Sequence, residues 1–353
     1  TNTLDSLRTF ELTNLKEGTY HLVALQDLNN NYRYNPGREK IAFLGEPITI
    51  PTDTIFNLTL FREQLSFKAE RPKQISGQKL LIGYQGKPTP DSLKFTPLSP
   101  VPDGFEYTLT KVAEKDSLHF WYKPDVDIDS LVLKLESPAG IDTLITRLKE
   151  MPKDSLVVST EPSGNLEFNK NFIFTANTPI AQADEQLISV LNKDSVSVPF
   201  SSELDKWNNI LQLDFEIQEN QTYYISGMPG AITDFFGAVN DTIKKTLKTR
   251  AFADYGNITL NLQNVKSYPV IVQLTDEKGV VKYEKYSTGE SSVRFDLLTP
   301  ATYLIRLIYD KNENGIWDTG SYLKKLPPEE IVYYPEPVEV RANWDVTETF
   351  ILN

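Results

Sequence analysis

The sequence predicts an all-β protein built from tandem β-sandwich modules, on three observations. Short stretches of alternating apolar and polar residues recur along the 353-residue chain and are rich in β-branched and aromatic residues, which favour a pleated, half-buried surface. The 22 prolines and 17 glycines interrupt these stretches at intervals of roughly 8–12 residues, as in β-sandwiches. Helical periodicity is scarce: residues 183–191 suit a short helix, although Ile188–Leu191 also suits a strand.

The clearest strand patterns are spread over the whole chain. We expect strands at residues 19–25, 79–84, 118–122, 131–135, 211–215, 258–262 and 303–309. Between them, turn-rich or proline-bearing junctions at 65–74, 151–154 and 249–256 indicate domain boundaries. We therefore divide the chain into four units, at 1–66, 67–151, 152–250 and 251–353. The second unit is expected to be an Ig-like or related sandwich.

The two ends of the chain carry the same succession of motifs. The first copy runs through Leu15–Tyr20, Asp27, Glu46-Pro47 and residues 56–61, and the second runs through Leu298–Tyr303, Asp310, Glu336-Pro337 and residues 347–352. The second copy is seven residues longer between its first Asp and its Glu-Pro pair. We interpret the ends as two copies of one β-sandwich module, of which the first copy is truncated at its N-terminus and lacks its opening strands.

Each copy contains a loop with oxygen-bearing side chains at positions 1, 3, 5 and 9. These residues are Asp310, Asn312, Asn314 and Asp318 in the second copy, and Asp27, Asn29, Asn31 and Asn35 in the first. Alternate residues of a tight loop can converge on one hard cation, as at the start of an EF-hand-type calcium loop. Gly315 occupies the sharp-turn sixth position and Ile316 the seventh, which offers a backbone carbonyl. Structural Ca²⁺ is therefore the one cofactor that the sequence suggests.

The twelfth position of these loops does not fit the calcium pattern. An EF-hand loop carries a bidentate Glu there, whereas this chain has Arg38 in the first copy and Ser321 in the second. The alternative is that the Asn and Asp side chains satisfy the backbone of their own long hairpin turn. Both interpretations stay open from the sequence.

Composition excludes several classes of chemistry. The chain has no cysteine and two histidines, His21 and His119, so it can build no disulfide, thiolate nucleophile or three-histidine metal centre. The net charge of −12 and the pI near 4.9 argue against nucleic-acid partners, which need clustered Lys and Arg. No run of about 18 apolar residues predicts a membrane-spanning helix.

The third unit contains Tyr223–Thr242, with the letters PGAITDFFGAVNDT at its C-terminal end, and Asn177–Ile180 upstream. It resembles the bacterial Ig-like domain of the S-layer type, in the version found in surface lipoproteins of Bacteroidota. The Pro-Gly and Phe-Gly-Ala elements are expected to form a compact loop that lets the chain cross between sheets. The resemblance covers about 95 residues.

The fourth unit resembles a transthyretin-like (prealbumin-like, CnaB-type) β-sandwich. The matching segments are Leu298–Arg306, Asp310–Gly320 (DKNENGIWDTG) and Arg341–Asp345 (RANWD). Ala301 replaces the Gly that is usual before the Tyr strand, whereas Gly18 keeps it in the first copy. The resemblance implies an exported, lipid-anchored outer-membrane protein, and it supplies no catalytic site that could be carried over to this chain. CnaB-type domains can form Lys–Asn isopeptide bonds, but no motif commits particular residues of this chain to one.

Enzyme interpretations find little support in the residues. A Ser–His–Asp triad needs a His that reaches both a nucleophile and a carboxylate, and His21 and His119 both lie inside expected strands. A pair of carboxylates can catalyse glycoside hydrolysis without His. Such a pair can be neither identified nor excluded from the sequence among 48 acidic residues. No Gly-rich phosphate loop of a nucleotide-binding kind is present. We expect no enzymatic activity.

Two groups of residues are candidates for binding. The aromatic residues Phe120-Trp121-Tyr122, Tyr333-Tyr334, Trp317 and Trp344 could stack on sugar rings, although we favour core and inter-domain packing because one face of each strand must be buried. The proline-rich segment 327–335 is the best candidate for a partner-contacting loop. Its alternative is a loop that packs against its own sandwich.

We therefore expect a non-enzymatic, multi-domain cell-surface protein that acts as a structural spacer or as a protein-binding component of an outer-membrane assembly. One alternative is a glycan-binding surface protein for polysaccharide capture. Another is an accessory domain array of an enzyme whose catalytic part lies outside this chain. The expected partners are other outer-membrane or cell-surface proteins, or glycans in the first alternative, but not nucleic acid. The expected location is exported, at the outer membrane, cell surface or periplasm, with attachment through an anchor that this chain does not contain.

Overall fold

The computed structural model describes residues 11–352 and shows a tandem all-β architecture, as the sequence predicts. Secondary structure in this range consists of strands and three single-turn 3-10 helices, at Pro90–Ser92, Glu185–Leu187 and Phe252–Asp254. The segment 183–191 is therefore not a helix beyond one turn, because Ile188–Leu191 forms a strand. No helix among the described residues is long and apolar enough to cross a membrane.

The second module packs two sheets face to face. Its strands are β5 (Lys68–Ala69), β6 (Lys73–Ser76), β7 (Lys79–Gln85), β8 (Lys94–Pro97), β9 (Glu106–Lys111), β10 (Ser117–Lys123), β11 (Ser130–Ser137) and β12 (Gly140–Arg147). One sheet has the order β5-β7-β10-β9, with β6 also on β7, and the other has the order β12-β11-β8. Alternate residues such as Leu80, Ile82, Leu131 and Leu133 are buried between the sheets, as expected of a sandwich.

The third module is also a two-sheet sandwich. Its strands are β13 (Val158–Glu161), β14 (Gly164–Asn165), β15 (Phe172–Ala176), β16 (Ile180–Ala183), β17 (Ile188–Leu191), β18 (Phe200–Asp205), β19 (Ile210–Phe215), β20 (Thr222–Gly227), β21 (Ile232–Asp234) and β22 (Ile243–Lys248). The sheets β13-β15-β19-β18 and β14-β22-β20-β17 enclose one apolar cluster, and β16 pairs with β21 beside them. The motif at 229–242 thus supplies β21 and the loop that follows it.

The fourth module has the largest apolar cluster of the described residues. Its strands are β23 (Gly256–Gln263), β24 (Val270–Thr275), β25 (Val281–Ser287), β26 (Ser292–Leu298), β27 (Ala301–Tyr309), β28 (Ile331–Tyr333), β29 (Val338–Val340) and β30 (Asp345–Ile351). The order is β26-β23-β30 in one sheet and β25-β24-β27-β28 in the other, with β29 also on β27. Every residue of β24 is buried, so this strand forms the centre of the module.

The first unit has far fewer buried apolar side chains than the other three units. It contains β1 (Gly18–Tyr20), β2 (Val23–Leu25), β3 (Ile41–Phe43) and β4 (Ile48–Ile50), paired as β1-β4 and β2-β3. Between residues 11 and 66, the buried apolar side chains are Ile41, Ala42 and Phe61. The described part of this unit therefore has two short antiparallel pairs and little core of its own.

Two strand predictions in the first unit are wrong. The strand expected at 19–25 is interrupted, because His21 and Leu22 lie between β1 and β2. The alternating stretch 56–61 forms no strand, and only Phe61 pairs, through an isolated bridge to Ile41. In the fourth module the matching stretch becomes β30 because β23 pairs with it along its length. No described strand of the first unit takes the place of β23.

Aromatic contacts join the third module to the second and to the fourth. Between the second and third modules, the ring of Phe236 lies 6.2 Å from that of Trp121, and Lys123 Nζ donates to the Phe235 carbonyl at 2.7 Å. Between the third and fourth modules, the ring of Phe168 contacts those of Phe252 and Tyr255 at 4.8 and 5.3 Å. The Phe-Phe pair of the PGAITDFFGAVNDT motif is thus part of an inter-module junction.

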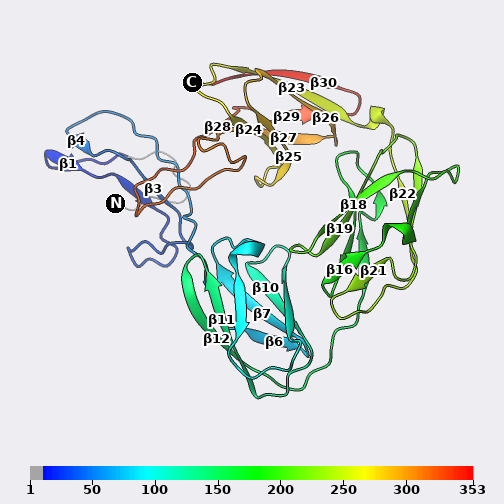
Figure 1. Ribbon diagram of the computed structural model, residues 1–353. Helices are drawn as coiled ribbons and strands as arrows, with labels where there is room; N and C mark the ends of the chain where they lie inside the picture. The colour runs from blue at the N-terminus through cyan, green and yellow to red at the C-terminus, as the bar shows by residue number, and fades with distance from the viewer. Residues whose placement is uncertain (1–10, 353) are drawn as a thin grey trace.

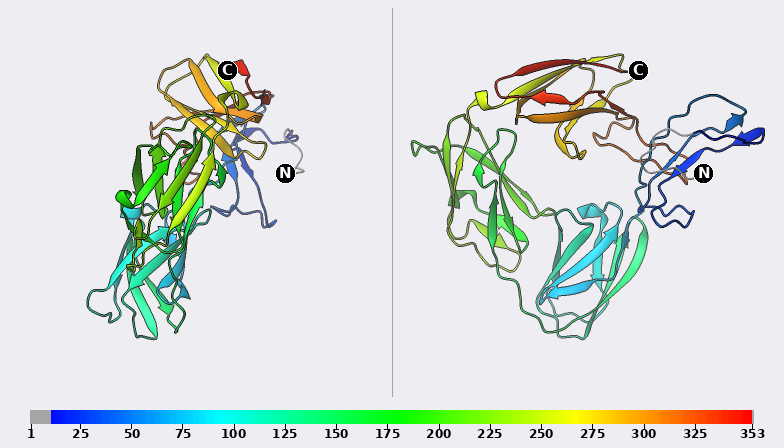
Figure 2. Two further views of the ribbon diagram at one scale, coloured as in Figure 1. Left: turned by 90° about the vertical axis from the view of Figure 1, so that its right-hand side faces the viewer. Right: turned by 180° about the vertical axis from the view of Figure 1, so that it is seen from behind.

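The four units form a closed ring because the fourth module returns to the first. Figure 1 shows the loop after β27 extending to the first unit, and Figure 2 shows the same arrangement from behind and from the side. We call residues 319–326 the clasp loop. Its ends pair through the Ser321–Leu326 bridge. The clasp loop lies in the part of the chain where the second sequence copy is seven residues longer than the first.

The clasp loop contacts the first unit through both polar and aromatic groups. Thr319 Oγ1 donates to the Arg62 carbonyl at 2.7 Å, and the Tyr322 N–H donates to Glu63 Oε1 at 2.6 Å. The Tyr322 ring lies edge-on to Phe43 and Tyr34, at 5.6 and 6.1 Å. Gly320 lies directly against the Phe61 ring, so that an added Cβ would come within 2.8 Å of it.

We predict that Gly320→Ala opens the ring. The new methyl group would meet the Phe61 ring and, at 2.7 Å, the Leu326 carbonyl, so the clasp loop must move off the first unit. Small-angle X-ray scattering should show a larger radius of gyration than for the unaltered protein. Gly289→Ala is the matched control, since a Cβ there meets nothing within 4 Å. Superimposable scattering curves for Gly320→Ala and the unaltered protein would contradict the role of the clasp.

Candidate functional site

The loop between β27 and β28 brings the predicted oxygen-bearing residues together. Asp310 is 2% exposed and directly follows β27, where its carboxylate accepts the N–H groups of Asn314 and Gly315 at 3.2 and 2.7 Å. Gly315 has a φ of +75°, a left-handed conformation that favours glycine. The carboxylate therefore organises the sharp turn that the sequence pattern predicts.

The remaining side chains of this loop converge on Asp318. Asn312 Nδ2 and Asn314 Nδ2 both donate to Asp318 Oδ2, at 2.7 and 2.6 Å. Asn314 Oδ1 accepts the N–H of Ile316 at 2.9 Å, while the Ile316 side chain is exposed. The structure thus places Asp310, Asn312, Asn314 and Asp318 in one hydrogen-bonded group.

Glu329 closes the loop and was missed by the sequence analysis. Its side chain is buried, and its two carboxylate oxygens accept the N–H groups of Lys311 at 2.7 Å and Asp318 at 2.9 Å. The Trp317 indole N–H donates to the Glu329 backbone carbonyl at 3.2 Å. Glu329 lies two residues before β28 and well beyond the twelfth position of the loop. The twelfth position, where the calcium pattern expects the acid, is occupied by Ser321 of the clasp loop.

The first copy repeats this arrangement. Asp27 accepts the N–H groups of Asn31 and Tyr32, at 3.2 and 2.8 Å, and Asn29 Oδ1 also accepts the Asn31 N–H. Partial burial acts to raise the pKa of Asp27, but these backbone donors outweigh it and lower the pKa below its ordinary value.

Glu39 takes the place of Glu329 in the first copy. It is 1% exposed and accepts the N–H groups of Leu28 at 3.1 Å and Asn35 at 2.8 Å. Arg38, at the twelfth loop position, is exposed. One acid in each copy therefore ties the second and ninth loop positions together. Comparing the two copies for a shared Glu before the next strand would have found this signal.

These loops are rich in acceptor groups, and the donors are backbone N–H groups and Asn side-chain amides of the same loops. Among residues 11–352, no group of three or more His, Cys, Asp or Glu side chains is arranged to hold a metal ion. The side-chain oxygens of each loop belong mainly to Asn amides and to carboxylates that accept backbone N–H groups. Formation of the turn alone therefore accounts for the hydrogen bonds within each loop. The geometry gives each loop a fixed shape.

The two histidines differ in their surroundings. His21 is exposed between β1 and β2. His119 lies on β10 with its ring edge-on to Trp121 at 5.6 Å. Burial and the nearby Lys79 cation lower the pKa of His119 to about 4, despite the opposing effect of Asp154. His119 is therefore neutral at physiological pH.

The predicted aromatic residues divide into a buried and an exposed group, with Trp317 and Tyr334 partly buried between these extremes. Phe120, Trp121 and Tyr122 are all at most 1% exposed, and the Trp121 indole N–H donates to Thr110 Oγ1 at 2.9 Å. They pack in the core and at the junction with the third module, as we favoured. Tyr333 and Trp344 are about half exposed or more, at 61% and 50%.

The proline-rich segment 327–335 packs partly against its own module. It forms β28, and the Tyr334 ring lies edge-on to Phe350 at 5.4 Å while its hydroxyl donates to Glu348 Oε2 at 2.7 Å. Glu329 is buried in the loop described above. Of the residues that we considered for partner contact, Tyr333 is exposed, and so are Pro327, Glu330 and Pro335.

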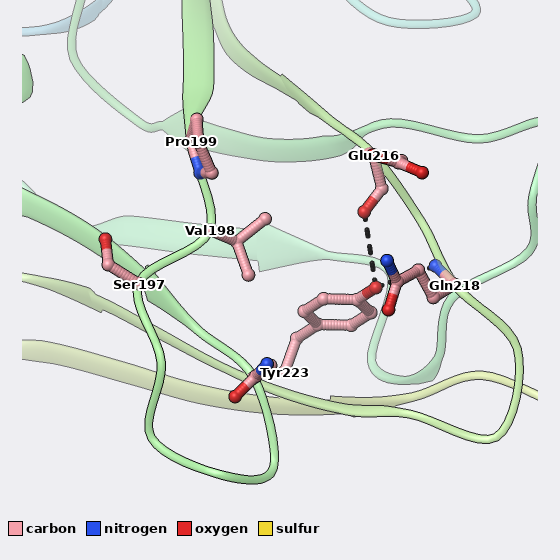
Figure 3. A pocket seen from close by; sticks show the side chains of 7 residues that line it. Ser197, Val198, Pro199, Glu216, Gln218 and Tyr223 are labelled. Carbon is pink, nitrogen blue, oxygen red and sulfur yellow. Dashed lines mark hydrogen bonds between the residues drawn. The ribbon is translucent and has the colours of Figure 1, made fainter.

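The hollows on the surface are modest. One of about 270 Å³ lies in the third module and is lined by Asn192, Ser197, Val198, Pro199, Glu216, Gln218 and Tyr223, as Figure 3 shows. The Tyr223 hydroxyl accepts the Gln218 N–H at 2.7 Å and donates to the Glu216 carbonyl at 3.3 Å. A second hollow, of about 490 Å³, lies between residues 65–69 and the β11–β12 hairpin. Both hydrogen bonds of the Tyr223 hydroxyl thus hold the segment 216–218 in place.

Comparisons with known proteins find similarity only among solved structures. No protein family and no curated protein matches the chain. The mixed-linkage glucan utilization protein SGBP-B of Bacteroides ovatus, solved with a heptasaccharide, aligns with 92% of this chain and 81% of its own at 11% identity and a TM-score of 0.24. The surface layer protein SbsC, domains 4–9, aligns with 89% of this chain and 53% of its own at 8% identity and a TM-score of 0.27.

The major pilin subunit BcpA of Bacillus cereus also aligns, over 70% of this chain and 94% of its own, at 10% identity and a TM-score of 0.19. At such low TM-scores the similarity does not extend to the arrangement of the modules. We take nothing about the function of this chain from it.

We predict that Glu329→Gln destabilises the fourth module. The amide offers only one acceptor oxygen, so one of the N–H groups of Lys311 and Asp318 loses its partner in a buried place, at a cost of about 1–3 kcal/mol. Urea unfolding followed by tryptophan fluorescence measures the change. Glu330→Gln is the matched control, because Glu330 makes an exposed ion pair with Lys266 and should cost less than about 1 kcal/mol. Equal midpoints for the two variants would contradict the assigned role of Glu329.

Proposed function

We propose that this protein is a non-enzymatic component of the cell surface, which acts as a spacer or protein-binding frame in an outer-membrane assembly. The observation that carries the proposal is the closed ring: the clasp loop joins the fourth module back to the first unit. A chain of sandwiches closed in this way holds its outer faces in fixed relative positions. Such a frame suits the presentation of binding surfaces better than it suits catalysis.

The junctions between modules support a frame. The junctions on the two sides of the third module each combine aromatic packing with a directed hydrogen bond, from Lys123 to the Phe235 carbonyl and from the Tyr255 hydroxyl to Glu167. Aromatic pairs contribute about 0.5–1.5 kcal/mol beyond the area they bury. Hydrogen bonds fix the relative angle of the partners, which apolar contact alone does not. The net charge of −12 favours solubility and opposes attachment to anionic surfaces.

The export of the protein and its lipid anchoring are part of this proposal. Their support is the resemblance of residues 223–242 and 298–345 to modules of Bacteroidota surface lipoproteins. The absence of cysteine fits modules that are stabilised by core packing, as the three apolar clusters show.

Affinity purification from the native outer membrane tests the function. The anchored protein, carrying a C-terminal tag and crosslinked before extraction, is expected to retain one or a few outer-membrane proteins at defined stoichiometry. A tagged Gly320→Ala variant, with the ring opened, should retain less of them. Recovery of the protein alone, in repeated crosslinked preparations, would contradict the assembly role.

A glycan-binding role is the second candidate, favoured by the exposed rings of Tyr333 and Trp344. Exposed aromatic side chains can stack on sugar rings. A glycan array with the labelled protein distinguishes the two roles: binding that is lost in Tyr333→Ala or Trp344→Ala supports the glycan role. An array without signal removes it and leaves the protein-binding role.

We also propose that the two Asp/Asn loops bind structural Ca²⁺, with the second loop as the principal site. The support is that Asp310, Asn312, Asn314 and Asp318 lie in one hydrogen-bonded turn, in which the oxygens of Asp310, Asn312 and Asn314 accept backbone N–H groups and Asp318 accepts the two Asn amides. A hard cation with oxygen ligands fits this chemistry. Bound Ca²⁺ would stiffen the loop that carries the clasp.

Thermal unfolding in EDTA and in Ca²⁺ tests this proposal. At Ca²⁺ 100-fold above its Kd, stabilisation of about 2.7 kcal/mol is expected, and Asp310→Ala should abolish the difference between the two conditions. Asp276→Ala is the control: Asp276 also caps a turn in the fourth module, at Lys278 and Val280, but belongs to no such group. Identical melting curves for the unaltered protein in EDTA and Ca²⁺ would remove the proposal.

A further inference from the structure

One tripeptide pattern recurs along the first three units. Nine of the 23 aspartates are followed by Ser or Thr and then by Leu, Ile or Val. These aspartates are Asp5, Asp53, Asp91, Asp116, Asp129, Asp142, Asp154, Asp194 and Asp241. The copy at Asp5 lies outside the described residues, and the structure shows the other eight.

Turn formation does not explain the preference for aspartate. Asn closes the same local turns as Asp, and the chain contains 23 residues of each kind. Among the asparagines, Asn2 alone is followed by such a pair, and none of the 25 glutamates is. The pattern therefore selects a short carboxylate, whereas a turn would accept the amide as well.

The carboxylates of most copies do not stabilise the fold. Asp142 accepts the N–H of Thr143 at 2.7 Å, while Asp154 accepts Ser76 Oγ at 2.7 Å and pairs with Lys79 at 3.6 Å. The other six carboxylates accept no hydrogen bond from the residues that the structure describes. Seven of the eight aspartates are exposed, and Asp154 is partly exposed.

The neighbouring hydroxyl groups are available in the same way. Ser92 donates to the Thr89 carbonyl at 2.7 Å, and Thr54 shares a hydrogen bond of 2.8 Å with Thr52. The other six hydroxyls have no hydrogen-bond partner within residues 11–352, and all eight Ser or Thr residues are exposed or partly exposed. Both polar groups of each tripeptide therefore reach the surface of a folded module.

The third position has an explanation within the fold. In four copies it is buried at the start of a strand or just before one, as Leu93, Leu118, Leu131 and Leu144. Core packing thus accounts for the apolar residue. It leaves the carboxylate and the hydroxyl without a function inside the chain, so another molecule must recognise them.

We propose that the Ser or Thr hydroxyl of this tripeptide is the acceptor of an O-linked sugar and that a transferase recognises the preceding aspartate. Ser and Thr alternate at the second position, and the group that they share is a nucleophilic hydroxyl. A carboxylate beside it offers the transferase a charge-assisted hydrogen bond. A phosphate at these positions would add negative charge beside each carboxylate, in a chain whose net charge is already −12. A neutral sugar avoids this repulsion.

The transfer is a substitution at a sugar carbon. The donor is a sugar whose anomeric carbon is bonded to the phosphate of a carrier. The Ser or Thr oxygen forms a bond to that carbon, and the bond between the carbon and the phosphate oxygen breaks. The phosphate leaves with the electron pair of that bond and, overall, takes up the hydroxyl proton.

The fourth module lacks the tripeptide, although it contains six aspartates. Its nearest approach is Asp318-Thr319, which Gly320 follows. The Thr319 hydroxyl donates to the Arg62 carbonyl at 2.7 Å in the clasp, where a sugar would separate the two units. The proposed acceptors are thus absent from the part of the chain that closes the ring.

Peptide mass spectrometry of the protein purified from its native membranes tests the proposal. Trypsin releases residues 135–147, which contain Thr143 after Asp142, and residues 286–294, which contain exposed Ser and Thr residues without a preceding aspartate. The first peptide should be heavier than its sequence by the mass of one or more sugar residues. The second should have the mass of its sequence.

Variants separate recognition from folding. Asp142→Asn keeps an oxygen for the Thr143 N–H, but it should lower the modified fraction of peptide 135–147 about tenfold, because the transferase loses a charge-assisted hydrogen bond. Thr143→Ala should remove the added mass, and Thr143→Ser should retain it. Ser137→Ala is the matched control in the same peptide, since Ser137 follows Glu136, and it should leave the sugar in place.

Four results would overturn the proposal. The first is a native peptide 135–147 with the mass of its sequence, and the second is equal modification of peptide 286–294. The third is an added mass that equals phosphate and that a phosphatase removes. The fourth is full modification in Asp142→Asn, since the aspartate would then not be recognised. The proposed frame role does not depend on any of these outcomes.

Discussion

A β-sandwich is stable because two sheets bury their apolar faces against each other, and the first unit shows only part of that arrangement. Its buried apolar side chains are Ile41, Ala42 and Phe61, whereas the fourth module, built from the same repeat, encloses a core between two complete sheets. What holds the first unit in place is the clasp loop, whose Gly320 and Tyr322 lie against Phe61 and Phe43. The closed ring and the fixed positions of the modules depend on this contact.

The two copies of the repeat thus share one loop arrangement, but only the loop of the second copy carries the clasp. Both copies use an Asp to organise a tight turn and a buried Glu to tie the second and ninth loop positions together. The seven added residues of the second copy extend the same loop into the clasp. A loop that is held rigidly at its base can carry a contact at its tip, which explains why the turn chemistry and the ring closure occur in one segment.

Local patterns in the sequence were sufficient for most of the strands. Alternation in stretches such as 79–84 and 131–135 reports burial on one face, and these became β7 and β11 with the expected residues inside. The stretch 56–61 alternates as well, yet it forms no strand, because a strand needs a hydrogen-bonding neighbour that its own residues do not specify. The same limitation applies to Glu39 and Glu329, which act on loop positions that are distant in sequence. The contact of Gly320 with Phe61 could not be predicted, since it joins residues from opposite ends of the chain.

The ring itself can be measured directly, because the chain has no cysteine and spin labels can be placed on two introduced cysteines alone. With labels at Asp53→Cys in the first unit and Lys278→Cys in the fourth module, double electron–electron resonance reports the distance across the clasp. A closed ring predicts one narrow distance distribution in the unaltered background. A broad distribution would show that the first unit moves independently of the fourth module and would contradict the closed ring.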